Sequence, residues 1–241
     1  MSVLNIKGVV KNISDKTTIY TPLVEVIVNA IQAIKSKQEQ NGEIVITVKR
    51  SRQSSLDDIA NIENFEITDN GIGFTADNKL SFDTLYSDKK ILEGGKGFGR
   101  FICLKYFENV YVESIYEEKN VFKKISFTMG KSNAIIENEK IEDLLDIPKT
   151  GSTIKLLGIK NPKLLEGAKK IELLAKNLVE KILPYFISRD FTCPKISITD
   201  GQDIIVLNNY INSFNGIKEI DIKKNDFSLE DELETFFSVK V

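Results

Sequence analysis

The sequence has no histidine among its 241 residues. This absence excludes enzymes that use a histidine base, zinc sites with histidine ligands, and phosphate transfer to a histidine of the same chain. Cysteine is scarce as well, because only Cys103 and Cys193 occur, far apart in the sequence. Two such cysteines provide neither a disulfide framework nor the spacing of a zinc site, so a reducing cytoplasm is the expected location.

Long apolar runs and a strong net charge are also lacking. No segment approaches the roughly 20 apolar residues that a membrane-spanning helix needs. The N-terminus does not have the pattern of a signal peptide, so we expect no membrane partner. A net charge of −2 gives no overall attraction for nucleic acid. What is present is the composition of an ordinary globular protein, with 41% hydrophobic and 28% charged residues.

The order of the apolar patterns predicts mixed secondary structure. Helices are expected at 21–40, 77–86, 98–107 and 163–187, and residues 87–99 are expected to form a loop. Strands are expected at 3–10, 43–50, 63–68, 109–117, 121–129, 133–137, 152–157, 195–199 and 202–207, with a hairpin turn at Asp200-Gly201. This order predicts an α/β (α+β) fold, a two-layer sandwich whose helices pack on one face of a mixed, mostly antiparallel sheet.

The helix expected at 21–40 carries a narrow polar stripe. Thr21 as N-cap and Pro22 at the first helical position predict its start. Its apolar side chains form one broad face, while Glu25, Asn29 and Gln32 fall together on the opposite side. Such a stripe is either the solvated side of a surface helix or the side of a mostly buried helix that faces a polar cleft. In the second case a ligand or water must satisfy the polar groups.

Two glycines follow an aspartate at the end of the strand expected at 63–68. Asp69 can accept a hydrogen bond from an amino group, and Gly71 and Gly73 let the backbone turn sharply and approach a ligand closely. The same residues also suit an ordinary turn, because Asp-Asn-Gly is a common turn sequence.

A second glycine cluster runs from Gly94 to Gly99 and precedes an apolar helical stretch. Glycines before a helix expose free N–H groups to an anion, the helix dipole assists, and Lys96 and Arg100 add positive charge. The cluster has neither the spacing of a Walker loop nor that of a dinucleotide-binding fingerprint. A flexible loop without a ligand is the alternative.

Four motifs therefore occur in order along the chain: Glu25-x-x-x-Asn29-Ala30, Asp69-x-Gly71-x-Gly73, Gly94-x-x-Gly97-x-Gly99 and Gly151-Ser152. In this order they resemble the motifs of the GHKL ATPases, the class of gyrase, heat-shock-90, histidine-kinase and MutL relatives, whose ATP-binding domain is also called the Bergerat fold. The resemblance covers about residues 21–158. Each motif is weak alone, whereas four in order are specific.

The resemblance implies a role for each matching residue. Glu25 corresponds to the general base that activates water, Asn29 to the ligand of Mg²⁺, and Asp69 to the acceptor of the adenine amino group. The cluster from Gly94 to Gly99 corresponds to the lid and the start of the phosphate-binding helix. The residues expected to bind the nucleotide are Asn29, Asp69, Gly71, Gly73, Phe74, Gly94, Gly95, Lys96, Gly97, Phe98, Gly99, Ser152 and Thr153.

Two departures from the family pattern bear on the branch. Gln32 stands where the MutL-type and heat-shock-90 relatives usually have aspartate, and the run from Asn29 to Ala33 is similar to that of some sensor histidine kinases. Those kinases commonly lack a carboxylate at the position of Glu25, which therefore favours hydrolysis. The second departure is a lysine that gyrase and MutL relatives take from a following domain, for which this chain offers no candidate.

The function implied is Mg-dependent ATP binding with slow hydrolysis, coupled to lid closure and homodimerisation, in the N-terminal part of a larger switch protein. Residues 1–160 would form the ATP-binding domain, and 161–241 a long helix and the start of a following, transducer-like segment. The downstream client, DNA or protein, is not identified by the sequence. The alternatives are a histidine-kinase-like domain that phosphorylates a separate protein, and a nucleotide-gated binding module with negligible turnover.

Overall fold

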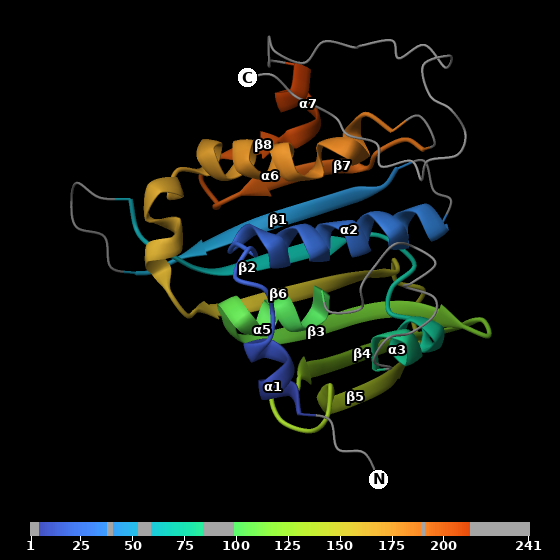
Figure 1. Ribbon diagram of the computed structural model, residues 1–241. Helices are drawn as coiled ribbons and strands as arrows, with labels where there is room; N and C mark the ends of the chain where they lie inside the picture. The colour runs from blue at the N-terminus through green and yellow to red at the C-terminus, as the bar shows by residue number, and fades with distance from the viewer. Residues whose placement is uncertain (1–4, 38–40, 53–58, 84–98, 189–190, 213–241) are drawn as a thin grey trace, which may run out of the picture.

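An eight-stranded sheet organises the part of the chain that the computed structural model describes, residues 5–37, 41–52, 59–83, 99–188 and 191–212 (Figure 1). The strand order is β5-β4-β3-β6-β2-β1-β7-β8. Strands β1 and β7 pair in parallel, and the other neighbours are antiparallel. The strands are β1 (Glu43–Arg50), β2 (Ile62–Asp69), β3 (Phe107–Glu118), β4 (Val121–Met129), β5 (Ile136–Leu144), β6 (Gly151–Ile159), β7 (Lys195–Thr199) and β8 (Ile204–Val206).

Helices cover one face of this sheet (Figure 1). Helix α2 (Tyr20–Lys37) packs on β1 and β2, with α5 (Gly99–Tyr106) on one side of it and α6 (Ile171–Phe186) on the other. The other helical segments described are α1 (Ile6–Lys11), α3 (Ala76–Asp83), the 3-10 helix η1 (Pro162–Ala168) and α7 (Leu207–Asn212). This arrangement confirms the predicted two-layer sandwich with a mixed, mostly antiparallel sheet. Among these helices, none has the length and apolar character needed to cross a membrane.

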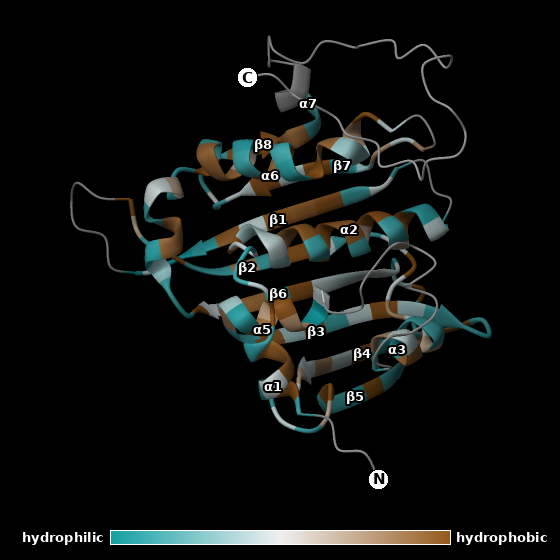
Figure 2. Ribbon diagram, viewed as in Figure 1, coloured by the Kyte–Doolittle hydropathy of each residue, from teal (hydrophilic) through white to brown (hydrophobic). Residues whose placement is uncertain are grey.

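The core lies between the helix layer and the sheet, where α2 and the central strands carry long apolar stretches (Figure 2). Leu23 and Ile27 of α2 and Ile46, Phe65 and Ile67 of the strands are all 0% exposed. In β1 and β2 these residues alternate with less buried ones, as expected when one face of a sheet packs on helices. The core therefore fixes which side of each strand faces the helices.

The opposite face of the sheet is polar. Lys124 of β4 pairs with Glu113 of β3 across 3.2 Å. On β6, the Lys155 ammonium lies 4.0 Å from a carboxylate oxygen of Glu66 and 5.6 Å from the ring centroid of Tyr111. Cross-strand pairs of opposite charge suit a sheet surface in contact with water.

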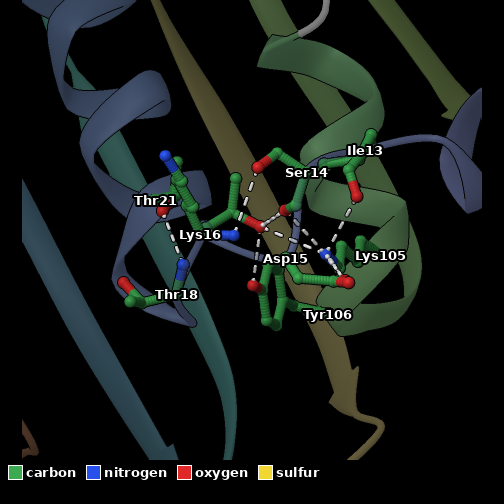
Figure 3. A network of polar contacts seen from close by, with 9 residues as sticks. Ile13, Ser14, Asp15, Lys16, Thr18, Thr21, Lys105 and Tyr106 are labelled. Carbon is green, nitrogen blue, oxygen red and sulfur yellow. Dashed lines mark hydrogen bonds and ion pairs between the residues drawn. The ribbon is translucent and has the colours of Figure 1, made fainter.

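The loop between α1 and α2 is fixed by the end of α5 (Figure 3). The ammonium of Lys105 donates to the Ser14 carbonyl oxygen (3.0 Å) and to Thr17 Oγ1 (3.3 Å), which also lies 2.8 Å from the hydroxyl of Tyr106. Helix α5 therefore holds the chain that leads into α2 as well as packing beside that helix.

Two predictions for the N-terminal part were wrong. Within 3–10, predicted as a strand, the described residues begin helix α1, because the side chain of Asn5 accepts the N–H of Gly8 (2.9 Å) and caps a first helical turn. Helix α2 begins at Tyr20, so Thr21 lies inside the first turn and is not the predicted N-cap. Its hydroxyl instead accepts the N–H of Thr18 (2.9 Å).

The single helix predicted over 163–187 is divided into η1 and α6. Between them the Lys169 carbonyl accepts a hydrogen bond from the Arg50 guanidinium (2.8 Å), which also pairs with Asp200 (2.9 Å). The backbone of Lys170 is extended there, with a ψ of 137°, and this interrupts the helical path before α6. Asp200 lies in the turn between antiparallel β7 and β8, which confirms the predicted hairpin.

Candidate functional site

A cavity lies beside α2, bounded also by α5 and by the ends of β2 and β6. Glu25, Asn29, Gln32 and Ser36 recur about one turn apart on α2, and all four line this cavity. The apolar side of the same helix is buried in the core. Of the two interpretations of the polar stripe, the structure therefore supports the one in which the stripe faces a polar cleft.

The N-terminus of α5 reaches the carboxylate of Glu25. Gly99, the first residue of α5, lines the cavity, and a Cβ added there would overlap with Glu25 Oε2. The Gly99 backbone therefore lies directly against the Glu25 carboxylate, and a larger residue there would require that carboxylate to move. The first turn of a helix presents free N–H groups and the positive end of the dipole, a setting that favours an anion. The other predicted residues of this cluster, Gly94, Gly95, Lys96, Gly97 and Phe98, lie outside the described residues.

Asp69 is the acidic residue at the end of β2 and is only 6% exposed. Its Oδ1 accepts the N–H of Gly71 at 2.8 Å, and the carboxylate lines the cavity. Burial raises the pKa of Asp69 to about 6, although backbone hydrogen bonds from Gly71 and Ser152 and the charge of Lys37 lower it. At neutral pH this buried carboxylate is ionised and accepts hydrogen bonds from any amino group placed against it.

The two glycines after Asp69 are required for different reasons. Gly73 lines the cavity with a φ of 78°, and a Cβ there would overlap with the Ile115 carbonyl oxygen. Gly71 does not line the cavity. A Cβ on Gly71 would lie 2.7 Å from the carbonyl carbon of Ala33 and 2.8 Å from its Cβ, so Gly71 lets the turn pack directly against α2.

Phe74 and Ser152 also line the cavity. Phe74 forms part of an apolar wall, its ring centroid 5.4 Å from that of Phe82. Thr153 follows Ser152 on β6 and therefore points to the opposite face of the sheet, where its Oγ1 lies 3.1 Å from Thr68 Oγ1. The structure thus brings Ser152 to the cavity and leaves Thr153 outside it.

Two further buried groups lie at the cavity or beside it: Ser114, to which no motif points, and Arg100, which was expected only to add positive charge. Ser114 on β3 is 2% exposed and lies directly opposite Ser152. Arg100 in the first turn of α5 is 6% exposed, lines the cavity, and lies 5.3 Å from the ring centroid of Phe82. Burial lowers the pKa of Arg100, while the charge of Asp83 raises it. A single serine in a strand carries no recognisable spacing, so Ser114 could not be found from the sequence.

Gly71→Ala should destabilise the fold by about 1–3 kcal/mol, because the added methyl forces the turn away from the α2 backbone. The shift would also move Asp69, whose carboxylate accepts the Gly71 N–H. Thermal unfolding measures the loss. Gly167→Ala is the matched control, since a Cβ there meets nothing within 4 Å. Equal unfolding temperatures for Gly71→Ala and the wild type would contradict the packing role.

Comparisons with known proteins agree with this geometry. A family model described as "Histidine kinase-, DNA gyrase B-, and HSP90-like ATPase" matches residues 14–139. No curated protein matches the chain. A solved structure described as "Crystal Structure of N terminal domain of a DNA repair protein" is similar, with a TM-score of 0.50 and 14% identity over 83% of this chain and 54% of that chain. At this identity the likeness shows the fold alone, and the chain spans about half of that structure, 54%. Because the family model covers more than half of the chain, the protein belongs to the histidine kinase-, DNA gyrase B- and HSP90-like ATPase family.

Proposed function

We propose that the protein binds ATP with Mg²⁺ in the cavity beside α2 and hydrolyses it slowly. The observation that carries this proposal is that one cavity joins a buried carboxylate, Asp69, to the Glu25–Asn29 pair and the glycine start of α5. A nucleotide needs these groups together, because its nucleobase needs a hydrogen-bond acceptor and its phosphates need a helix N-terminus. Hydrolysis further needs a base for the attacking water.

The base of the nucleotide would lie at the Asp69 end. The Asp69 carboxylate would accept the adenine amino group, with Ser152 beside it. Gly73 lets the backbone approach the base, and Phe74 contributes an apolar wall against which a flat ring can pack. Gly71 serves this end indirectly by holding the Asp69 turn against α2.

The phosphates would lie between α2 and the start of α5. Asn29 would supply an amide oxygen for Mg²⁺, and oxygen donors suit this cation, which takes one or two protein ligands together with phosphate oxygens and water. The described residues contain no group of three or more cysteine or acidic side chains that could hold a metal ion by themselves. In this proposal the phosphate oxygens of ATP would therefore complete the coordination of Mg²⁺. When bound, the ion would offset the negative charge of the phosphates. The N-terminus of α5 and Arg100 add positive potential on the other side.

Glu25 would be the general base. It lies one turn before Asn29 on the same stripe, so its carboxylate faces the same end of the cavity. The carboxylate would accept a proton from water as the water oxygen attacks the terminal phosphorus, with ADP as the leaving group. The charge of Glu25 also contributes, after burial, to raising the pKa of Tyr185 on α6. The charge of Glu25 therefore acts on a side chain of helix α6.

Closure and assembly complete the proposal. Residues 87–99 would close over bound ATP, supported by their glycine content, and closure would favour a homodimer in the cytoplasm. The ATP-binding unit would comprise residues 1–160, with β7 and β8 extending its sheet. The family name also covers histidine kinases, so phosphorylation of a separate protein is the alternative. Glu25 favours water as the acceptor.

Calorimetry with ATP, with and without Mg²⁺, tests binding, and release of inorganic phosphate tests hydrolysis. Hydrogen exchange across 87–99 and light scattering, both with a non-hydrolysable analogue, test closure and dimerisation. Absence of ATP binding in the folded protein overturns the whole proposal. Binding without phosphate release above that of a Glu25→Ala control would leave a nucleotide-gated binding module.

ATP affinity should fall with acidity because of Asp69. Its pKa of about 6 makes the carboxylate ionised above that pH and protonated below it. The adenine amino group forms a stronger hydrogen bond with the ionised carboxylate. ATP affinity should therefore be highest near pH 7.5 and should fall as the pH drops through 6. Calorimetry at pH 7.5 and pH 5 should show a loss of about tenfold, set by the fraction of ionised Asp69.

The phosphates of ATP titrate in the same range, so the comparison needs a control. Asp69→Asn shares the phosphate titration and lacks the carboxylate. The pH-dependent loss beyond that of Asp69→Asn therefore belongs to Asp69. Parallel pH profiles for the two proteins would show that Asp69 does not contact the base.

A further inference from the structure

Ser114 is the centre of a small buried hydrogen-bond network at the base end of the cavity. Its hydroxyl accepts the N–H of Phe74 at 2.8 Å and lies 2.8 Å from the carbonyl oxygen of Gly151. It also lies 3.0 Å from the hydroxyl of Ser152. Ser114 itself is 2% exposed, whereas Ser152 lines the cavity.

The hydrogens of this network have one arrangement that satisfies every group. A serine hydroxyl has one proton to donate and two lone pairs to accept. Ser114 gives its proton to the Gly151 carbonyl and accepts from Phe74 N–H, which leaves one lone pair. The Ser152 hydroxyl must then donate to Ser114. The reverse direction would take the proton from the Gly151 carbonyl and leave Ser114 with an unused lone pair, at a cost in a buried site.

The direction of the Ser152 proton decides what the cavity sees. With that proton turned toward Ser114, the Ser152 oxygen faces the cavity only as an acceptor. Asp69, on the neighbouring strand and directly opposite Ser152, is also an acceptor when ionised. Two adjacent groups therefore offer lone pairs and no hydrogen.

We propose that Ser114 is a positioning residue that makes the base-binding wall of Asp69 and Ser152 accept hydrogen bonds only, so that the site selects bases carrying an amino group. The inference rests on the proposed ATP function and adds a specificity determinant outside the motifs. A purine without the amino group presents only ring nitrogens there, which are acceptors. Such a base leaves both wall groups without a hydrogen-bond donor.

The test compares two ligands, ATP and the triphosphate of purine riboside, which lacks the 6-amino group. Calorimetry on the wild type should show ATP bound about tenfold or more tighter. In Ser114→Ala the Ser152 hydroxyl loses its acceptor and can turn its proton toward a ring nitrogen. The affinity gap between the two ligands should therefore narrow several-fold, and Ser114→Thr, which keeps the hydroxyl, should restore it.

Ser197→Ala is the matched control, because Ser197 is a strand serine of 5% exposure outside the residues that line the cavity. It should keep the wild-type gap. An unchanged gap in folded Ser114→Ala, or equal loss for both ligands, would overturn the inference, since a merely structural role weakens both alike.

If Ser114→Ala does not fold, Ser152→Ala decides. If the Ser152 hydroxyl is an acceptor, its removal weakens the binding of ATP alone and narrows the affinity gap between the two ligands. If it is a donor to the ring nitrogen, its removal weakens the binding of both ligands and leaves the affinity gap unchanged. The second result would overturn the inference. A wild type that binds neither ligand defeats the proposed function, whereas one that binds both equally defeats only the selection by this wall.

Discussion

Replacing Glu25 with alanine should leave ATP bound and remove most of its hydrolysis. Glu25 lines the cavity one turn before Asn29, and its carboxylate lies against Gly99 at the start of α5. If the phosphates occupy that end, the carboxylate is the group able to take a proton from the attacking water. Loss of a general base reduces the rate by about 10²–10⁴-fold. The measurement is phosphate release at saturating ATP, together with calorimetric affinity.

Three control variants distinguish a general-base role of Glu25 from other roles of this side chain. Glu25→Gln keeps the shape and removes the charge, so it should lose turnover as well. Asn29→Ala should lose the Mg-dependent part of ATP binding, which Glu25→Ala should keep. Glu180→Ala removes an exposed glutamate of α6 and should change neither quantity. If Glu25→Ala hydrolyses ATP at the wild-type rate, with contaminating ATPases excluded, another group is the base.

Much of the fold followed from periodicity. Helix α2 and strands β1 and β2 matched their predicted spans closely, because each buries one regular apolar face against the others. The alternation in β1 and β2 also fixes the side on which Asp69 lies. The carboxylate therefore faces α2 and its polar stripe, and it lines the same cavity as Glu25 and Asn29 of that stripe. From the sequence, the motifs were joined only by the family resemblance.

The elements that could not be predicted depend on single contacts or on edge positions. Helix α1 depends on a cap by Asn5. The break before α6 is an extended residue, Lys170, beside the Lys169 carbonyl that Arg50 contacts from a distant strand. Strand β5 was predicted at 133–137 and lies at Ile136–Leu144, mostly exposed at the edge of the sheet. An exposed edge strand has no apolar alternation to mark its length.

Residues of the candidate site that belong to a motif could be predicted from the sequence. Residues that reach the site only through the pairing of distant strands could not. Adjacent Ser152 and Thr153 were both expected at the nucleotide, but neighbouring residues of a strand face opposite sides, so only Ser152 reaches the cavity. Ser114 is far from every motif in sequence. It joins the site because β3 pairs with β6 in the register that places it opposite Ser152.

Asp69→Asn should weaken ATP binding by about 10–100-fold at pH 7.5, because a charge-assisted hydrogen bond contributes about 1.5–3 kcal/mol. The change replaces an acceptor-only carboxylate by an amide whose NH₂ group meets the adenine amino group as a second donor. The stability of the Asp69→Asn variant, by contrast, should equal or exceed that of the wild type. Burial raises the pKa of Asp69 to about 6, above its unfolded value, so ionisation above that pH costs stability. The neutral amide avoids this cost, so the variant should unfold at the same temperature or higher.

A half-buried aspartate, Asp200, provides the control. Asp200 accepts backbone N–H groups in the β7–β8 turn and pairs with Arg50, and neither residue lines the cavity. Hydrogen bonds and the Arg50 charge lower the pKa of Asp200 against the effect of its burial, so its ionised form stabilises the fold. Asp200→Asn should therefore lower the unfolding temperature and leave ATP affinity unchanged. The two variants have opposite expected effects on stability and affinity. Unchanged ATP affinity in folded Asp69→Asn would show that this carboxylate does not bind the base.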